Sequence, residues 1–503
     1  IMREFGTMED FDRLLKEIHK REMRLVLDLV VNHTSDEHPW FEEARKSRHN
    51  PYYNYYHWWP AEKGEPPLRL SYFDEEGNAW MYNKSTDSYY LHYFSRKQPD
   101  LNWENPEVRQ EIFDMMRFWF DKGIDGFRMD SISLIAEDPS FPLIDSKKYP
   151  DIFSFYAKEP RLHLYLHEMN RQVLSKYDCM SVGEGSAVMV DDVAKFVDPA
   201  REELNMLYHF DAARIRNTTL PDNPESGIDY SLIALKKMFT EWDKAVDKGW
   251  PSIYLGNHDQ PRMVSRFGSD KDEFRALSAK MLITFLLTMR GTPYWFAGDE
   301  IGMRNIRFDH IEDYNDIDTI NRYKKAKAEG KDPQAVLDEQ KETGRDNART
   351  PFQWDRSPEA GFTAGTPWLK VNPDYTWINV ADEEKDPTSI LNYFKKVVSF
   401  RKENPSLIYG SYHLLDAENP QCYTFLRKTG ADTYLIMLNF SPKAAISTPG
   451  IDMSNAHVLL DNYGDRSHMA PQKDITLRPF EAIVFQLNHP VYESFIDSLD
   501  LLE

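Results

Sequence analysis

The sequence repeats one pattern, a short run of apolar residues that ends in charged or amide side chains. It occurs at residues 25–33, 124–130, 179–184 and 252–259, with weaker examples at 204–210 and 292–298. Helical patterns stand between these runs; Asn105-Pro106 begins one with an N-cap and a proline, and Gly123 ends it. Strands that alternate with helices and carry polar residues at their C-terminal ends predict a parallel α/β barrel with its active site at that face. About six such strands can be counted, and a closed barrel has eight.

Charged residues at the strand ends narrow the chemistry. Arg128 and Asp130 lie two residues apart, which places them on one face of a strand. Buried charge is costly, so such a pair is usually compensated or functional, and taken alone it fits a structural role as well as a catalytic one. Glu184 and Asp259 end two further strands in the same way. Three carboxylates at one barrel face favour glycoside hydrolysis, which needs one nucleophile and one acid.

Four segments in this order, 28–33, 126–130, 182–184 and 257–262, resemble the signature regions of the α-amylase superfamily. Residues 98–103 and 348–354 resemble the α-glucosidase and oligo-1,6-glucosidase branch of that superfamily. The resemblance covers nearly the whole chain. It implies a TIM (β/α)8 barrel whose first two strands, with a loop that carries a sugar-binding aspartate, precede Ile1. We expect no cofactor and no metal.

Composition changes along the chain predict how it divides into domains. Residues 34–101 are rich in Trp, Tyr and Pro and contain a hairpin pattern at 80–91, and the resemblance makes them an inserted lid domain. The catalytic barrel then comprises 1–33 and 102–405, and the pattern at 389–401 predicts its last helix. A second insertion lies at about 304–375, where the charged helical stretch at 324–341 indicates a solvated face. From about 408 the pattern alternates as in antiparallel strands, which predicts a C-terminal β-domain at 406–488. The tail, 489–503, is unassigned.

The resemblance assigns roles to single residues. Asp130 is the expected nucleophile, held anionic by Arg128, and Glu184 is the expected acid/base, with apolar neighbours that would raise its pKa. Asp259 is the third catalytic carboxylate. The expected substrate-binding residues are His33, Phe94, Gln98, Arg128, His258 and Arg349. The aspartate partner of Arg349 would precede Ile1.

Simpler roles remain open for several of these residues. A lone histidine is more often structural than functional, although His33 and His258 both lie beside carboxylates. Arg349 could brace a loop, and Asp28 fits a buried salt-bridge partner better than a catalyst.

Ser131, directly after the expected nucleophile, bears on linkage. In this branch valine at that position accompanies α-1,6 preference, and small residues or threonine accompany α-1,4. We therefore expect a retaining, exo-acting α-glucosidase that favours α-1,4 over α-1,6 linkages.

Several alternatives remain open. They are an oligo-1,6-glucosidase, a sucrose-active glucosyltransferase or isomerase on the same site, a non-catalytic relative like the amino-acid transporter heavy-chain ectodomains, and an inactive fragment. Residues 213–217 match the isomerase pattern poorly, which favours hydrolysis.

Composition limits the partners. The 61 basic and 82 acidic residues give a formal charge of −21, which argues against nucleic acid and anionic membranes. Two distant cysteines offer no disulfide framework. No apolar run reaches about 20 residues, so no transmembrane helix is expected. We expect a cytoplasmic monomer that acts on a disaccharide or short oligosaccharide.

Overall fold

The computed structural model describes residues 1–503 apart from 74–76, 146, 150–152, 431, 467–472 and 488–503. The chain forms two compact units. The first unit contains Ile1–Phe210 and Ala245–Trp250, and the second contains Asp211–Lys244 and Pro251–Glu503. The unassigned tail, 489–503, lies outside the described residues.

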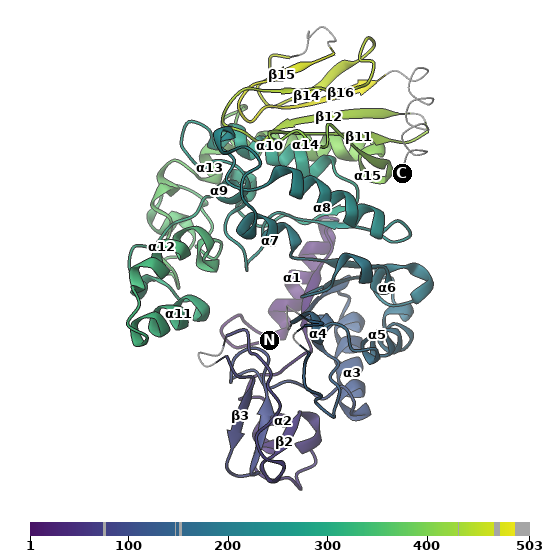
Figure 1. Ribbon diagram of the computed structural model, residues 1–503, viewed down its shortest axis with the longest axis vertical. Helices are drawn as coiled ribbons and strands as arrows, with labels where there is room; N and C mark the ends of the chain where they lie inside the picture. The colour runs from purple at the N-terminus through teal and green to yellow at the C-terminus, as the bar shows by residue number, and fades with distance from the viewer. Residues whose placement is uncertain (74–76, 146, 150–152, 431, 467–472, 488–503) are drawn as a thin grey trace. The chain divides into compact units, whose positions relative to one another are not determined.

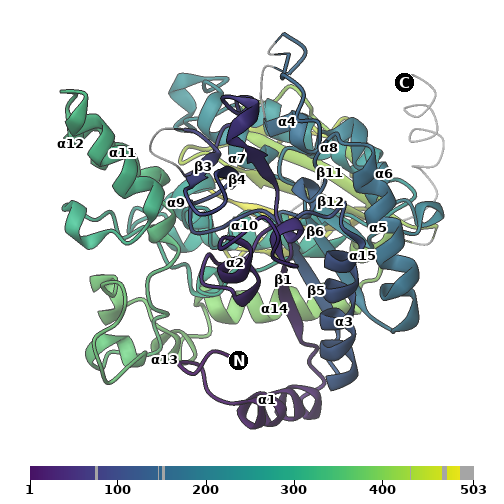
Figure 2. The same cartoon turned by 90° about the horizontal axis from the view of Figure 1, so that it is seen from below.

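A four-stranded parallel sheet organises the first unit, in the order β1-β5-β6-β7; Figure 2 labels β1, β5 and β6, and Figure 1 labels the helices of this unit. Its strands are β1 (Val26–Val30), β5 (Gly126–Asp130), β6 (Met180–Glu184) and β7 (Met206–Tyr208). The helices of this unit are α1 (Met8–Lys20), α2 (Pro39–Ala44), α3 (Pro106–Lys122), α4 (Phe153–Tyr156), α5 (Arg161–Gln172) and α6 (Ala194–Val197). The four predicted strands of this region are confirmed.

Helix α3 shows how the sequence sets the start of β5. The Asn105 side chain accepts a hydrogen bond from the N–H of Glu107, and Gly123 ends the helix with φ at 104°. Phe113 and Met116 belong to the buried face of the helix, whereas Met115 is only partly covered. The chain then turns directly into β5, whose last residue is Asp130.

An antiparallel sheet lies in the region predicted to be a lid. Its strands are β2 (Trp58–Pro60), β3 (Trp80–Asn83) and β4 (Ser88–Leu91), in the order β2-β4-β3, so the predicted hairpin is confirmed. Trp80 and Leu91 pack in one cluster with Leu134, Phe141 and Tyr156 from the segment after β5. This sheet is therefore tied to the loop that follows Asp130.

The second unit begins with helices and a short parallel strand pair. The helices are α7 (Asp211–Thr218), α8 (Leu232–Ala245), α9 (Met263–Phe267), α10 (Arg275–Thr288), α11 (Ile317–Ala328), α12 (Pro333–Thr343), α13 (Val380–Glu383), α14 (Ile390–Glu403) and α15 (Ser406–Tyr409). Strands β8 (Ser252–Ile253) and β9 (Thr292–Pro293) pair in parallel. Helix α10 is almost wholly buried and packs against α14. The predicted last barrel helix at 389–401 is α14, capped by Ser389.

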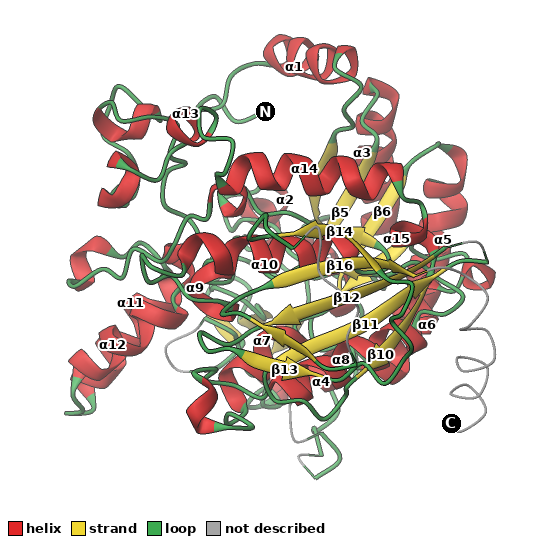
Figure 3. Ribbon diagram, turned by 90° about the horizontal axis from the view of Figure 1, so that it is seen from above, coloured by secondary structure: helices red, strands yellow, loops and turns green. Residues whose placement is uncertain are grey.

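The C-terminal strands form an antiparallel sheet in the order β10-β11-β12-β16-β14 (Figure 3). Its strands are β10 (Ser411–Leu415), β11 (Cys422–Lys428), β12 (Thr433–Asn439), β14 (His457–Asp461) and β16 (Ala482–Leu487), and β13 (Ala445–Ser447) pairs separately with β15 (Ile475–Leu477). Antiparallel strands thus follow the final helix, as the sequence predicts. Across the described parts of the chain, every helix is too short or too polar to cross a membrane.

Candidate active site

Arg128 is the centre of a charged cluster in the first unit. Its Nη1 donates to Asp130 Oδ1 at 2.6 Å and to Asp28 Oδ1 at 2.8 Å, and its Nη2 donates to Glu184 Oε2 at 2.5 Å. Nε also donates to the Tyr208 hydroxyl at 3.0 Å. The strand register explains the meeting, because Arg128 pairs with Asp28 on β1 and with Val182 on β6, two residues before Glu184. The predicted Arg128–Asp130 pair is confirmed.

Most of this cluster is shielded from water. The side chains of Glu184, Arg128 and Asp130 are 8%, 17% and 22% exposed. Burial by itself lowers the pKa of Arg128, but the facing acidic groups, Glu184 first, outweigh it and raise that pKa overall. Asp28 is an ion-pair partner, as expected, but its side chain is 54% exposed, so its predicted burial is wrong.

The surroundings of Glu184 differ from the sequence-based expectation. Apolar residues adjoin it along the chain, but its carboxylate accepts hydrogen bonds from Arg128, from the N–H of Ser131 at 3.2 Å and from Ser186 Oγ at 3.2 Å. The contacts reach it from β5 and from the turns that follow both strands. Polar donors therefore face the carboxylate that was expected in an apolar setting.

Ser131 turns the chain sharply at the end of β5. It adopts φ 44° and ψ 32°, in the left-handed region, and its side chain is buried. A residue other than glycine is uncommon there, and a β-branched one is a genuine outlier. This conformation aims the Ser131 N–H at Glu184, which sequence reasoning did not foresee.

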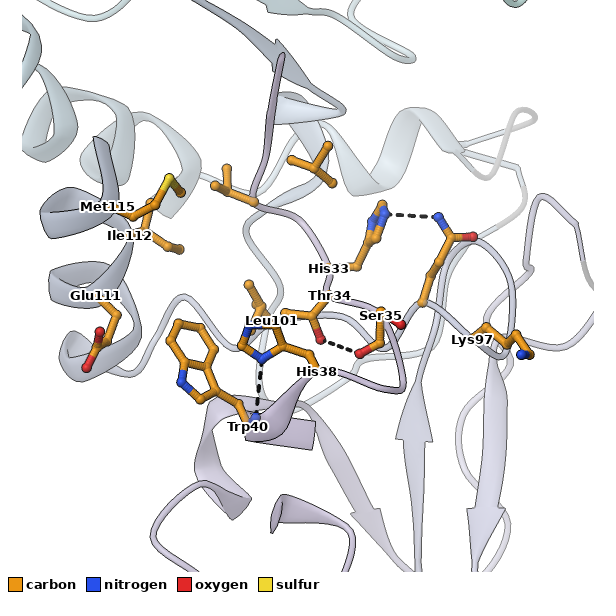
Figure 4. A pocket seen from close by; sticks show the side chains of 13 residues that line it. His33, Thr34, Ser35, His38, Trp40, Lys97, Leu101, Glu111, Ile112 and Met115 are labelled. Atoms are coloured by element: carbon orange, nitrogen blue, oxygen red, sulfur yellow. Dashed lines mark hydrogen bonds between the residues drawn. The ribbon is translucent and has the colours of Figure 1, made fainter. Parts of the chain in front are cut away.

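Three of the predicted substrate-binding residues lie together in the first unit. Gln98 Nε2 is 3.0 Å from His33 Nε2, and the His33 and Phe94 ring centroids are 5.2 Å apart. Burial lowers the pKa of His33, and the Asp130 carboxylate acts in the opposite direction. His33 and Gln98 line a cavity of about 640 Å³ that continues beside Trp40 (Figure 4).

Asp259 is the centre of a separate charged cluster in the second unit. Its Oδ1 accepts from Arg349 Nη2 at 2.7 Å and from Arg345 Nη1 at 3.2 Å, and its Oδ2 lies 3.3 Å from His258 Nε2. Burial by itself raises the pKa of Asp259, but His258 and the two arginines outweigh it and lower that pKa overall. Asp259 is therefore a carboxylate held in its ionised form.

Sequence reasoning missed Arg345 and Asp316. Asp316 is buried, caps α11 and accepts a short hydrogen bond from Arg345, and Arg349 Nη1 lies 3.7 Å from it. Among the described residues, Asp259 and Asp316 are the aspartates whose carboxylates lie within ion-pair distance of the Arg349 guanidinium. The spacing of Arg345 and Arg349, four residues apart, was a signal in the sequence. Asp316 had none, because only the fold brings it to them.

The structure thus places the expected site residues in two groups. Asp130, Glu184, Arg128, His33, Phe94 and Gln98 belong to the first unit, and Asp259, His258 and Arg349 belong to the second. Within the described ranges, no set of three His, Cys, Asp or Glu side chains is arranged to hold a metal ion. The expectation of a metal-free site stays a prediction.

Comparison with known proteins decides the family. The family description "Alpha amylase, catalytic domain" matches residues 1–410, more than three quarters of the chain. The chain belongs to the α-amylase family. It is 49% identical over 501 residues to the oligo-1,6-glucosidase of Parageobacillus thermoglucosidasius, covering 97% of this chain and 88% of that protein. The α-glucosidase of Pediococcus pentosaceus is 40% identical, with 97% and 87% covered.

A solved structure extends this likeness to three dimensions. An isomaltulose synthase variant from Erwinia rhapontici, in complex with sucrose, superposes with a TM-score of 0.90 at 40% identity, covering 97% of this chain and 87% of that one. This α-amylase family member is therefore a glycoside hydrolase of the α-glucosidase type. Its fold class is a TIM barrel with a C-terminal antiparallel β-domain, as the sequence predicts.

Proposed function

We propose that this enzyme is a retaining, exo-acting α-glucosidase that releases glucose from the non-reducing end of short α-glucosides. The observation that carries the proposal is one guanidinium, Arg128, which contacts both Asp130 and Glu184. These two residues follow the paired Met129 and Gly183 on neighbouring strands. Because such strands lie about 4.8 Å apart, the two carboxyls suit the short separation of about 5–5.5 Å that retaining enzymes use.

In the proposed mechanism Asp130 attacks the anomeric carbon while Glu184 gives a proton to the leaving oxygen. Glu184 then takes a proton from water as that water breaks the bond between glucose and Asp130. Arg128 donates a hydrogen bond to Asp130 Oδ1 at 2.6 Å and holds this carboxylate in place for the attack. Asp259 stabilises positive charge on the sugar in the transition state. The hydroxyl groups and the ring of the bound sugar are held by the other proposed site residues, His33, Phe94, Gln98, His258 and Arg349.

Two variants and one product analysis test these roles. Asp130→Asn should abolish turnover. Glu184→Gln should lower kcat/KM on disaccharides more than on activated aryl glucosides, whose leaving groups need no proton. Asp28→Asn is the matched control, because Asp28 contacts the same arginine without a proposed chemical role. NMR should show that the first sugar released has the α configuration. Initial release of β-glucose would refute retention.

We further propose that α-1,4 linkages are favoured over α-1,6, on the strength of Ser131. Ser131 directly follows the proposed nucleophile and its N–H donates to the proposed acid, which supports a position beside the leaving sugar. A pocket residue that differs by one small group changes discrimination by about 10- to 200-fold. Oligo-1,6-glucosidase activity is the second candidate, favoured by the name of the relative that is 49% identical.

The linkage test must allow for the backbone at Ser131. Valine there would be strained at φ 44° whatever its effect on the pocket. Threonine has the same shape and the same strain, so Ser131→Thr and Ser131→Val form a matched pair. We expect kcat/KM to favour maltose over isomaltose for the unmodified enzyme and Ser131→Thr, and to move towards isomaltose only for Ser131→Val. An unmodified enzyme that strongly prefers isomaltose would refute the role of Ser131.

Sucrose isomerisation is the remaining candidate, favoured by the isomaltulose synthase structure. It differs from hydrolysis in whether water or the released fructose intercepts the glucosyl-enzyme. We expect glucose and fructose from sucrose, because residues 213–217 match the isomerase pattern poorly. Isomaltulose or trehalulose as the main product would reverse this assignment.

A further inference from the structure

Arg262, at the end of the stretch that carries Asp259, joins three distant segments of the second unit. Its side chain is 2% exposed. Nη1 donates to the carbonyl of Ala297 at 2.7 Å and Nη2 to the carbonyl of Ala348 at 3.0 Å. Asp299 Oδ1 lies 3.7 Å from Nη1 and balances the charge. A group so deeply covered does not meet substrate, so its role must pass through its neighbours.

Two glycines leave the room that this buried pair occupies. Gly298 has φ +103°, and a Cβ there would lie 2.8 Å from Arg262 Nη1. A Cβ at Gly256 would lie 3.0 Å from Asp299 Oδ2. Side chains at these positions would crowd the pair from either side. The backbone is therefore shaped around the guanidinium and its counter-ion.

The contacts of Arg262 close a ring that contains the proposed substrate-binding groups. Ala348, which accepts from Arg262, is followed directly by Arg349. Arg349 donates to Asp259 Oδ1 at 2.7 Å and to the carbonyl of His258 at 2.8 Å. Asp259 in turn precedes Arg262 by three residues. If the Arg262–Ala348 hydrogen bond is lost, the main chain before Arg349 is no longer tied to residues 257–262. Only the side chain of Arg349 then connects it to that segment.

We propose that Arg262 is a positioning residue that fixes Arg349 against Asp259, so that both meet the sugar in one arrangement. The proposal rests on the substrate-binding roles proposed above for Asp259 and Arg349. It assigns Arg262 no contact with substrate. Its effect on catalysis should therefore appear only through Arg349.

Arg262→Lys in the full chain is the main test. Lysine keeps a positive charge beside Asp299, but a single ammonium cannot reproduce the two-pronged donation to Ala297 and Ala348. We expect kcat/KM on an aryl α-glucoside to fall roughly 10- to 150-fold, the range of a charge-assisted hydrogen bond. In an Arg349→Ala background the same substitution should cost less than about threefold, because coupled residues are not additive. Independent losses that simply multiply would overturn the proposal.

Arg275 supplies a matched control. It is also buried, donates to two carbonyls, those of Ile301 and Gly302, and lies 3.8 Å from the Glu383 carboxylate. None of these partners belongs to the Asp259 loop or to the segment before Arg349. Arg275→Lys should lower the melting temperature about as much as Arg262→Lys. Its loss in kcat/KM should multiply with the loss caused by Arg349→Ala, as expected for independent sites. If the kcat/KM losses of both variants shrink equally in the Arg349→Ala background, the effect of Arg262→Lys reflects a general loss of stability, and the proposal is wrong.

A crystal structure of Arg262→Lys separates this proposal from the proposed function. We expect Arg349 to leave hydrogen-bond distance of Asp259, and its retention there would overturn the proposal whatever the kinetics show. If Arg349→Ala is itself fully active, the substrate-binding role of Arg349 fails, and the crystal structure alone decides the inference. Gly256→Ala is a second perturbation of the same pair, because a Cβ there would lie 3.0 Å from Asp299 Oδ2. If neither variant folds, Arg262 determines the fold, and the positioning role is wrong.

Discussion

Replacement of Arg128 should disable the first charged cluster in a way that the pH dependence reveals. One guanidinium contacts Asp130 at 2.6 Å and Glu184 at 2.5 Å, and all three side chains are mostly buried. In Arg128→Lys a single ammonium can approach one carboxylate well but cannot span both. Loss of one charge-assisted hydrogen bond is worth about 1.5–3 kcal/mol, which corresponds to roughly 10- to 150-fold in kcat/KM.

Arg128→Ala should have the larger effect, because it leaves two carboxylates side by side with no cation between them. Like charges at short distance raise the pKa of one member of such a pair. The acid limb of the kcat/KM profile should therefore move to higher pH in Arg128→Ala and stay nearly in place in Arg128→Lys. Breaking a buried pair costs about 3–5 kcal/mol, which corresponds to a loss of roughly 150- to 5,000-fold in kcat/KM.

The assay is kcat/KM on an aryl α-glucoside between pH 4 and 9, with Tyr208→Phe as the control. Tyr208 accepts from the same guanidinium but is not charged, so its loss should cost only about 1 kcal/mol and leave the acid limb unmoved. A full activity of Arg128→Lys with an unchanged profile would show that Arg128 does not govern the two carboxylates.

Three further predictions concern stability. Burial raises the pKa of Glu137 to about 8, so the folded chain keeps a proton that the unfolded chain releases. The free energy of unfolding should therefore fall as pH rises from about 5 to 8. Urea unfolding of Glu137→Gln should show a weaker dependence of this free energy on pH. Lys236→Met should cost about 2–5 kcal/mol in urea unfolding, because three main-chain carbonyls lose their buried donor, whereas the exposed Lys237→Met should be nearly neutral. Gly123→Ala should lower the free energy of unfolding by about 1 kcal/mol, measured the same way. The cost comes from the φ of 104°, which disfavours a side chain, and it stays small because a Cβ would meet only Leu15, at 3.7 Å.

Local patterns in the sequence were enough to predict the strands, the last barrel helix and the contacts within each motif. Arg128 meets Asp130 because they share a strand face, and the strand period acts over a short distance. His33 and Gln98, which are 65 residues apart, were named as site residues from motif wording alone, and their contact was not predicted. The division of the chain into barrel, lid and β-domain stays a prediction.

Residues that depend on distant segments could not be predicted in this way. Arg345 and Asp316 reach Asp259 and Arg349 from an insertion whose charged helical pattern indicates only a solvated surface. The left-handed conformation at Ser131 could not be predicted from the sequence, because serine occurs in many backbone conformations. Glycine or asparagine at that position would have been a signal.

Glu184 shows why neighbours along the chain are a poor guide to a strand-end carboxylate. Its apolar sequence neighbours suggested an apolar site, but the residue that faces it comes from the adjacent strand. The parallel register pairs Arg128 with Val182, and the period of two then sets Glu184 on the same face as Asp130. Cross-strand register therefore decides the charge around the proposed acid.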